Sequence, residues 1–117
     1  MRISVADYIV SRLYELTGSK HCFLLSGGGA MYLLDALGRS KKINFIPMHH
    51  EQAATIAADA YGRVHNTIGV ALVTSGPGGT NAITGIVGAW LESTTLLVIS
   101  GQVSRANWKW DTGVRQM

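Results

Sequence analysis

The chain has 117 residues, of which 47% are hydrophobic and 15% are charged, and its formal net charge is +3. This length suffices for one domain with a buried core and is too short for two. Because soluble domains usually carry about 25% charged residues, the low charge predicts that another domain or subunit covers part of the surface.

The predicted elements alternate between helix and strand. A helix is predicted over 4–17, because Ser4 and Asp7 are typical of an N-cap and Gly18 can end the helix. Its apolar residues recur at helical spacing: Val5, Tyr8, Ile9, Leu13 and Leu16. The pattern predicts further helices over 29–39, 51–64 and 79–92, and strands over 21–25, 44–48, 68–74 and 95–100.

The segment 68–74 is a continuous run of apolar and β-branched residues, which is typical of a strand that a parallel sheet buries on both faces. Strands that alternate with helices of ten or more residues favour an α/β fold. We therefore expect one three-layer α/β/α domain over residues 1–117, with a central parallel sheet.

The same sequence excludes several classes of site and partner. Cys22 is the only cysteine, so neither an internal disulfide nor a cysteine-based metal site can form, and its apolar neighbours predict a buried structural thiol. The basic and aromatic segment 104–110 has too few cations for a nucleic-acid footprint and is interpreted as an interface loop. With no signal-peptide pattern and no run of roughly 18 apolar residues, we expect a cytoplasmic protein without a membrane partner.

Unusual segments follow every predicted strand: SGGGAM, HHEQ, TSGPGGTN and SGQV. The carboxyl ends of parallel strands lie at one edge of a sheet, and ligands bind at that edge. We therefore expect the glycine-rich loops and the His-His-Glu group to be neighbours in space and to form one site.

Taken singly, these motifs leave alternatives open. SGGGAM can form a phosphate-binding turn at a helix N-terminus, or it can simply allow a tight turn from strand to helix. GPGGTN nearly matches a dinucleotide fingerprint but has Asn81 in place of the last glycine, and neither loop carries the Lys-Ser/Thr pair of a P-loop. His49 and His50 are adjacent rather than four residues apart, which argues against a zinc site and favours a structural role.

Glu51 is predicted to lie in the first turn of the helix over 51–64. A carboxylate there is favoured by the helix dipole, which gives Glu51 a structural explanation. The helix that it begins, however, consists of small residues that allow another backbone to come close. A carboxylate at a strand-to-helix junction, beside glycine loops, indicates a buried acid that serves a ligand.

In this order and spacing, HHEQAATIAADAYGR, TSGPGGTNAITGI and LLVISGQV resemble the N-terminal pyrimidine-binding domain of thiamine-diphosphate-dependent enzymes, in their acetolactate synthase-like branch. The resemblance covers essentially the whole chain. It implies a transferase or lyase that acts on a 2-oxo acid such as pyruvate, with thiamine diphosphate bound between two subunits of a homodimer or tetramer. It also implies that Glu51 is the catalytic acid, which hydrogen-bonds the pyrimidine ring nitrogen and activates the cofactor.

The resemblance further implies which residues surround the cofactor. Residues of the GPGGTN loop would line the pyrimidine pocket, and residues of the SGGG loop would lie over the reacting end of the cofactor. His50 matches the histidine that usually precedes the glutamate. The cofactor-binding residues predicted in this way are Ser26, Gly27, Gly28, His50, Glu51, Thr74, Pro77, Gly78 and Asn81, and no metal ligand is expected.

Three departures from the family pattern qualify the resemblance. The chain lacks the Gly-Asp-Gly…Asn motif, so we expect a domain absent from this chain to hold the diphosphate and Mg²⁺. It ends before the family's Phe/Ile-Gln-Glu segment and before the final helix and strand of the domain. We therefore expect an incomplete domain, truncated at its C-terminal end, that is inactive alone and belongs to a longer polypeptide. Ser26 replaces an aromatic residue common in acetolactate synthases, which leaves the substrate open.

Two hypotheses from other classes remain. One is a non-catalytic phosphate- or nucleotide-binding α/β module, and the other is a purely structural interaction domain. Function resides in the site rather than in the fold. Glu51 discriminates between an enzyme and a nucleotide-binding module, because the latter has no need of a buried acid.

Overall fold

A computed structural model of the chain describes residues 2–104. Of the segment 104–110, interpreted above as an interface loop, only Ser104 falls within the described residues.

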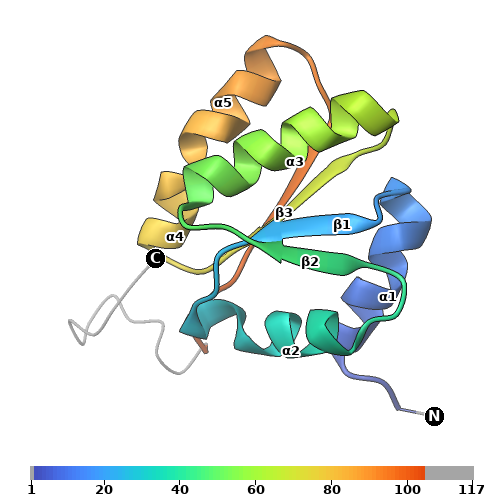
Figure 1. Cartoon of the computed structure of the whole chain (residues 1–117). Coiled ribbons are helices and arrows are strands. Elements are labelled where there is room, and N and C mark those ends of the chain that lie inside the picture. The colour runs from blue at the N-terminus through green and yellow to red at the C-terminus, as the bar shows by residue number, and fades with distance from the viewer. Residues whose placement is uncertain (1, 105–117) are drawn as a thin grey trace.

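The described strands form one parallel sheet (Figure 1). They are β1 (His21–Leu24), β2 (Asn44–Pro47), β3 (Gly69–Val73) and β4 (Leu96–Ser100), in the order β2-β1-β3-β4. Phe23 of β1 pairs with Ala71 of β3, and Ala71 pairs in turn with Val98 of β4. Each strand lies within one residue of its predicted ends, and the predicted parallel sheet is confirmed.

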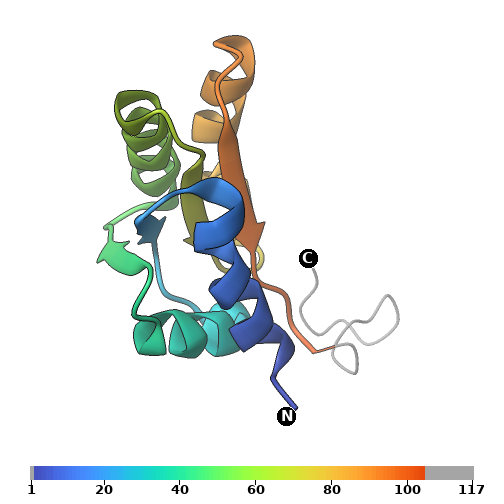
Figure 2. The same cartoon turned by 90° about the vertical axis from the view of Figure 1, so that its right-hand side faces the viewer.

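Helices cover both faces of this sheet. They are α1 (Val5–Thr17), α2 (Met31–Arg39), α3 (Glu51–His65), α4 (Pro77–Asn81) and α5 (Ile83–Leu91), and a 3₁₀ turn, η1 (Gly28–Ala30), precedes α2. Two views at right angles place α1 and α2 together on one side of the sheet and α3 and α5 together on the other (Figures 1 and 2). The predicted three-layer α/β/α architecture is confirmed.

A separate core fills each side of the sheet. The larger core joins Val10 and Leu13 of α1 and Leu37 of α2 to alternate residues of the sheet, among them Cys22 and Val70. The smaller core packs Ala54 and Ala58 of α3 against the strand residues whose side chains point to the other face of the sheet, including Ala71. All five residues of β3 are buried, as the continuous apolar run predicts, because helices lie on both of its faces.

The caps of α1 form as predicted, but its buried face differs from the predicted apolar stripe. Ser4 Oγ accepts a hydrogen bond from the Asp7 amide at 3.0 Å, and Gly18 ends the helix with φ of 70°. The inward face is formed by Val10, Leu13 and Thr17. Other apolar residues of α1 point outward, with exposed fractions of 75%, 56% and 66% for Val5, Tyr8 and Leu16. Helical spacing identifies a stripe, but the packing of α1 against α2 decides which stripe is buried.

The helix predicted over 79–92 begins earlier and is divided. Gly76 has φ of 65°, a conformation that favours glycine. Pro77 follows at the first helical position, where the N–H group that proline lacks would have no partner within the helix. The helical segment therefore starts at Pro77, and it is split into α4 and α5 at Ala82.

Helix α3 approaches the sheet closely, as its small residues predict. A Cβ atom added at Gly69 would lie 2.1 Å from the backbone oxygen of Ala58, and one added at Gly62 would lie 2.7 Å from the Gly69 nitrogen. Backbone thus packs on backbone where the second half of α3 crosses the start of β3. Among residues 2–104, none of the helices combines the length and the apolar character needed to span a bilayer.

Cys22 provides a test of the larger core. Its side chain is 1% exposed, and burial raises the pKa of the thiol to about 12. At pH 8 this leaves on the order of 10³-fold less thiolate than in an unfolded chain, and the thiolate is the reactive form. We expect iodoacetamide to modify the native chain at least about 10³-fold more slowly than the urea-unfolded chain, because the buried thiol is also shielded from the reagent, as measured by mass spectrometry. Similar rates in the two states would contradict the packing of β1 described here.

Candidate functional site

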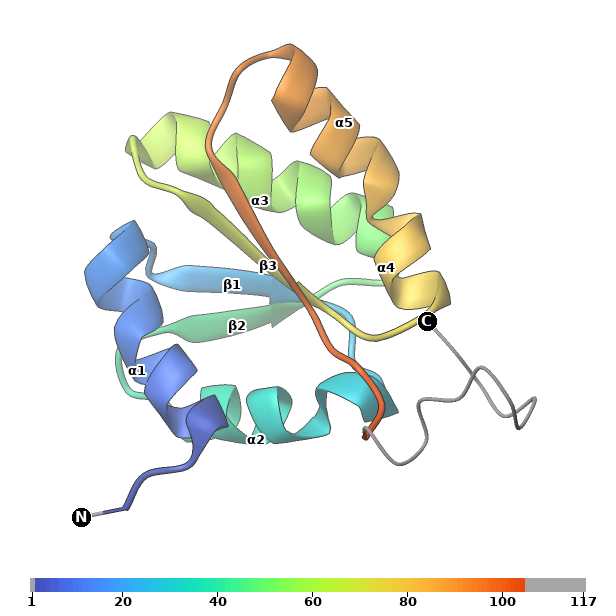
Figure 3. The same cartoon turned by 180° about the vertical axis from the view of Figure 1, so that it is seen from behind.

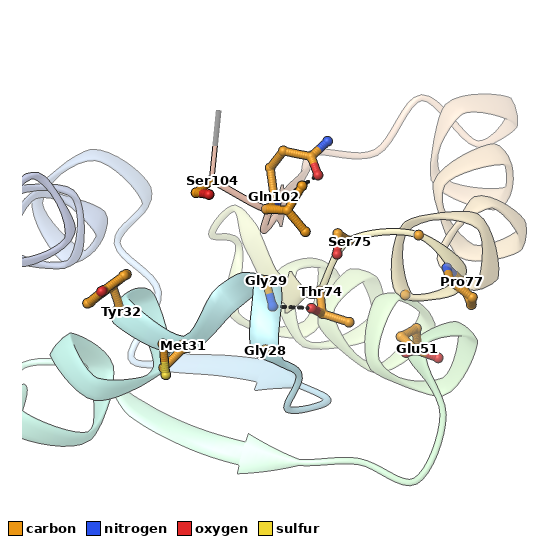
Figure 4. Close-up of a pocket in the computed structure, with 13 residues that line it drawn as sticks. Gly28, Gly29, Met31, Tyr32, Glu51, Thr74, Ser75, Pro77, Gln102 and Ser104 are labelled. Atoms are coloured by element: carbon orange, nitrogen blue, oxygen red, sulfur yellow. Dashed lines mark hydrogen bonds between the residues drawn. The ribbon is translucent and has the colours of Figure 1, made fainter. Parts of the chain in front are cut away.

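The loops that follow the four strands surround one open pocket at the carboxyl edge of the sheet, as predicted (Figure 4). Its volume is about 880 Å³. Seen from behind, β4 runs alongside β3 and ends beside the turn that begins α2 (Figure 3). The lining residues are Gly28, Gly29, Met31, Tyr32, Glu51, Thr74, Ser75, Gly76, Pro77, Gly78, Gln102, Val103 and Ser104.

Thr74, directly after β3, holds these loops together. Its Oγ1 accepts a hydrogen bond from the Gly29 amide at 3.0 Å, and its carbonyl oxygen accepts one from Ser100 Oγ at 3.2 Å. A Cβ atom at Gly27 would lie 2.4 Å from the Thr74 side chain, and one at Gly78 would lie 2.7 Å from it. The glycines therefore allow two loops to pack directly on one threonine side chain.

The backbone of the SGGG loop bonds largely to itself and to Thr74. The Ala30 amide donates to the Gly27 carbonyl oxygen at 3.0 Å, and the Met31 amide donates to that of Gly28. Together with the Gly29 amide on Thr74, three consecutive N–H groups are already occupied. This arrangement supports the tight-turn interpretation of SGGGAM over a phosphate-binding turn, which needs free N–H groups.

Glu51 begins α3 at the wall of the pocket and is only 6% exposed. The residue before it, His50, is the N-cap, and its Nδ1 accepts a hydrogen bond from the Gln52 amide at 3.1 Å. His50 is exposed and lies outside the pocket lining. A structural role thus accounts for His50, while the carboxylate of Glu51 enters the site.

The two carboxylate oxygens of Glu51 have different surroundings. Oε2 accepts a hydrogen bond from Asn81 Nδ2 at 3.1 Å. Oε1 lies 3.5 Å from the point that a Cβ atom on Gly78 would occupy. The same point lies 2.7 Å from the methyl group of Thr74, so Oε1, Gly78 and Thr74 are packed together. All three residues line the pocket, and a ligand that enters it can therefore reach the carboxylate of Glu51.

Five of the residues predicted to bind a cofactor line the pocket: Gly28, Glu51, Thr74, Pro77 and Gly78. The other four lie outside the lining. Gly27 packs on Thr74, Asn81 bonds to Glu51, His50 caps α3, and Ser26 is exposed in the loop after β1. What each residue binds stays a prediction.

Sequence reasoning did not assign the part of the pocket farthest from Glu51. Met31 and Tyr32 reach it from the start of α2, and Gln102 reaches it from the loop after β4 (Figure 4). Their segments, SGGGAM and SGQV, were expected at this edge of the sheet. The position directly after a strand was therefore the one signal that could have identified these residues as part of the site. Among residues 2–104, no group of three or more His, Cys, Asp or Glu side chains is arranged to hold a metal ion.

Comparison with known proteins identifies relatives of this arrangement. The family described as "Thiamine pyrophosphate enzyme, N-terminal TPP binding domain" matches residues 3–117. The acetolactate synthase large subunit of Buchnera aphidicola subsp. Schizaphis graminum is 46% identical over 102 residues, which are 87% of this chain and 18% of that protein. The acetolactate synthase isozyme 3 large subunit of Escherichia coli K12 is 44% identical over the same shares of each chain.

A eukaryotic relative gives a similar result. The mitochondrial acetolactate synthase of Schizosaccharomyces pombe is 52% identical over 85 residues, which are 73% of this chain and 13% of that protein. The chain therefore spans less than a fifth of the length of these relatives.

Neighbouring glycines of the site offer a matched test of its packing. A methyl group at Gly27 would collide with Thr74, whereas one at Gly28 meets no atom within 4 Å. Gly27 is extended, with φ of −175°, so the expected penalty is steric. We expect Gly27→Ala to lower the free energy of unfolding by about 1–3 kcal/mol, and Gly28→Ala to change it by less than ~0.5 kcal/mol, both measured by urea denaturation. Equal effects would show that the loop does not rest on Thr74.

Proposed function

Because the chain belongs to the thiamine pyrophosphate enzymes, as their N-terminal TPP-binding domain, we propose that its pocket binds the aminopyrimidine of thiamine diphosphate and that Glu51 activates the cofactor. The observation that carries this proposal is the carboxylate of Glu51, which is almost fully buried yet lines the pocket. A buried carboxylate is costly unless it is paired, so its presence at a ligand-sized pocket favours a functional role.

The residues around Glu51 fit a flat heteroaromatic ring. Glu51 and Gly78 line the same pocket, and a carboxylate there can exchange a proton with a ring nitrogen of a bound ligand. Pro77 and Thr74 add apolar and hydroxyl surface to the same wall. When bound, thiamine diphosphate supplies the nucleophilic carbon and the electron sink for cleaving or joining 2-oxo acids.

The remaining features of the proposal concern the whole protein. We propose that the segment works within a longer cytoplasmic polypeptide, an acetolactate synthase-like transferase or lyase that uses a 2-oxo acid such as pyruvate. The support is the identity to acetolactate synthases that are several times longer than this chain. A further domain would hold the diphosphate and Mg²⁺, so the isolated chain would be inactive.

A second subunit is proposed on the basis of the outer surface of α5. Apolar side chains there are exposed together with one on the neighbouring helix α3: Ile56, Ile83, Ile86, Val87, Trp90 and Leu91. The largest of them, Trp90, is 82% exposed. Exposed apolar patches of this kind mark association surfaces. We propose that this face, hereafter the α5 face, packs against a second subunit in a homodimer or tetramer.

Association through the α5 face can be measured on this chain. We expect sedimentation velocity at micromolar concentration to detect a dimer or larger species, and Trp90→Glu to shift it toward the monomer by placing a charge in the contact. Leu16→Glu is the matched control, because Leu16 is similarly exposed, at 66%, on α1. A monomer in the unmodified chain, or equal effects of the two substitutions, would contradict this assignment.

The catalytic role of Glu51 is tested in the full-length protein. Glu51→Gln keeps the size of the side chain and its hydrogen-bonding capacity but removes the exchangeable acid. General acid–base assistance contributes about 10²–10⁴-fold in rate, so we expect a loss in this range with cofactor binding weakened but retained. The measurement is hydrogen–deuterium exchange at C2 of bound thiamine diphosphate.

The control is Glu92→Gln, the same chemical change at the C-cap of α5, outside the pocket lining. It should leave the exchange rate unchanged. If Glu51→Gln exchanged as fast as the unmodified protein, Glu51 would be only a charge at a helix N-terminus, and the proposed function would be wrong.

A further inference from the structure

Asn81, the last residue of α4, contacts the carboxylate of Glu51. It lies outside the pocket lining and donates from Nδ2 to Glu51 Oε2 at 3.1 Å. Within residues 2–104, the one fully buried side-chain oxygen or nitrogen without a partner is Thr67 Oγ1. Glu51 Oε1 is not such an atom, so it is accessible from the pocket that Glu51 lines.

The short helix α4 places Gly78 and a hydrogen-bond donor, Asn81, next to the Glu51 carboxylate. Gly78 and Asn81 are three residues apart on α4, so they project from the same side of the helix. Oε1 is the carboxylate oxygen next to Gly78, whereas Asn81 binds Oε2. The two oxygens of this carboxylate therefore have different neighbours on α4: Oε2 accepts a hydrogen bond from Asn81, and Oε1 lies beside Gly78.

A buried hydroxyl group lies between the elements that carry these two residues. Thr55 is fully buried, and its Oγ1 lies 3.1 Å from the Glu51 carbonyl oxygen and 3.4 Å from that of Ala82, the residue after Asn81. A Cβ atom at Gly85 would lie 2.1 Å from the same Thr55 Oγ1. The N-terminal part of α3 and the junction of α4 and α5 are therefore packed in contact, which keeps Asn81 within reach of Glu51.

The carboxylate needs such a partner to adopt one orientation. Rotation about the last side-chain bond of glutamate has broad, shallow minima, so packing alone does not fix which oxygen points at a ligand. A hydrogen bond from an amide to an ionised carboxylate is directional and stronger than one between neutral groups. Asn81 can supply this restraint, because its amide donates to Oε2, and the oxygen next to Gly78 is Oε1.

We propose that Asn81 is a positioning residue that binds Glu51 Oε2 and leaves Oε1 as the single oxygen that exchanges a proton with the ligand. This inference rests on the proposed function of Glu51. It assigns Asn81 no contact with the cofactor, and it predicts that Asn81 affects proton transfer far more than cofactor binding.

The first test uses this chain without any ligand. The side-chain amide of Asn81 should give a hydrogen-bonded signal in ¹H–¹⁵N spectra, and Glu51→Ala should shift that signal and speed its exchange with solvent. The side-chain amide of Asn44, an exposed residue of β2, is the control and should not change. An Asn81 signal that Glu51→Ala leaves unmoved would overturn the proposal.

The second test is a double-mutant cycle in the full-length protein, with C2 exchange of bound thiamine diphosphate and its dissociation constant as readouts. Misplacing a reacting group by about 1 Å costs up to ~10²-fold, so we expect Asn81→Ala to slow exchange by about 10- to 100-fold. The dissociation constant should change by less than about threefold, since the hydrogen bond that Asn81→Ala removes joins two protein side chains and does not involve the ligand. In a Glu51→Ala background, Asn81→Ala should have no further effect, because its partner is gone.

Asn81→Asp keeps the shape of the side chain but replaces the donor with a second carboxylate, so it should slow exchange at least as much. This variant covers the case that Asn81→Ala fails to fold.

The outcomes separate the two proposals. If Glu51→Ala left exchange unchanged, the proposed function would fail, and the role of Asn81 would fail with it. If Glu51→Ala slowed exchange but Asn81→Ala acted equally in both backgrounds, or weakened cofactor binding as much as it slowed exchange, the role of Glu51 would stand and the positioning role of Asn81 would be wrong.

Discussion

The pocket depends on the space around the side chain of Thr74. Loops that follow β1 and β3 meet there, and Cβ atoms at Gly27 and Gly78 would lie 2.4 Å and 2.7 Å from that side chain. A methyl group at Gly27 would push the loop after β1 away from Thr74, because the overlap includes the Thr74 Cβ atom, which cannot move without its backbone. The Thr74 hydroxyl also accepts the Gly29 amide, so one residue both spaces the loops and bonds them. Glu51 Oε1 lies beside the same contact, 3.5 Å from the point that a Cβ atom on Gly78 would occupy.

The chemistry of the site depends on the different surroundings of the two carboxylate oxygens of Glu51. Glu51 is held at the start of α3, whose dipole favours negative charge, and it is nearly removed from water. Burial of an ionised group requires compensation, which the amide of Asn81 provides at one oxygen. The other oxygen, Oε1, is open to the pocket that Glu51 lines, so a ligand can reach it without breaking the contact with Asn81.

Most of the fold could be predicted from local patterns, because those patterns correspond to single elements. The run over 68–74 identifies a strand buried on both faces, and Ser4 and Gly18 mark the ends of α1. Other features depend on contacts between distant segments. Apolar spacing in α1 cannot reveal that Val5 faces outward, since the position of α2 decides this.

The candidate site could likewise be predicted only in part. Its location at one sheet edge, and Glu51 within it, follow from topology and from the family motifs. The partner of Glu51 does not, because the contact joins residues 30 positions apart through a helix break that no local signal marks. Met31 and Gln102 were likewise in segments assigned to the correct edge, yet only their three-dimensional packing directs them into the pocket.

The lining of the pocket comes from loops spread along the chain from Gly28 to Ser104, and this has a thermodynamic consequence. A partly folded chain that lacks any one strand cannot present the complete binding surface, so a ligand that needs this surface binds the native state alone. Binding of that kind stabilises the whole domain by mass action, by about 2.7 kcal/mol when the free ligand is at 100 times its dissociation constant. Abundance of such a protein in a cell would then follow the supply of its ligand, because ligand-free molecules unfold more often and are the ones exposed to proteases.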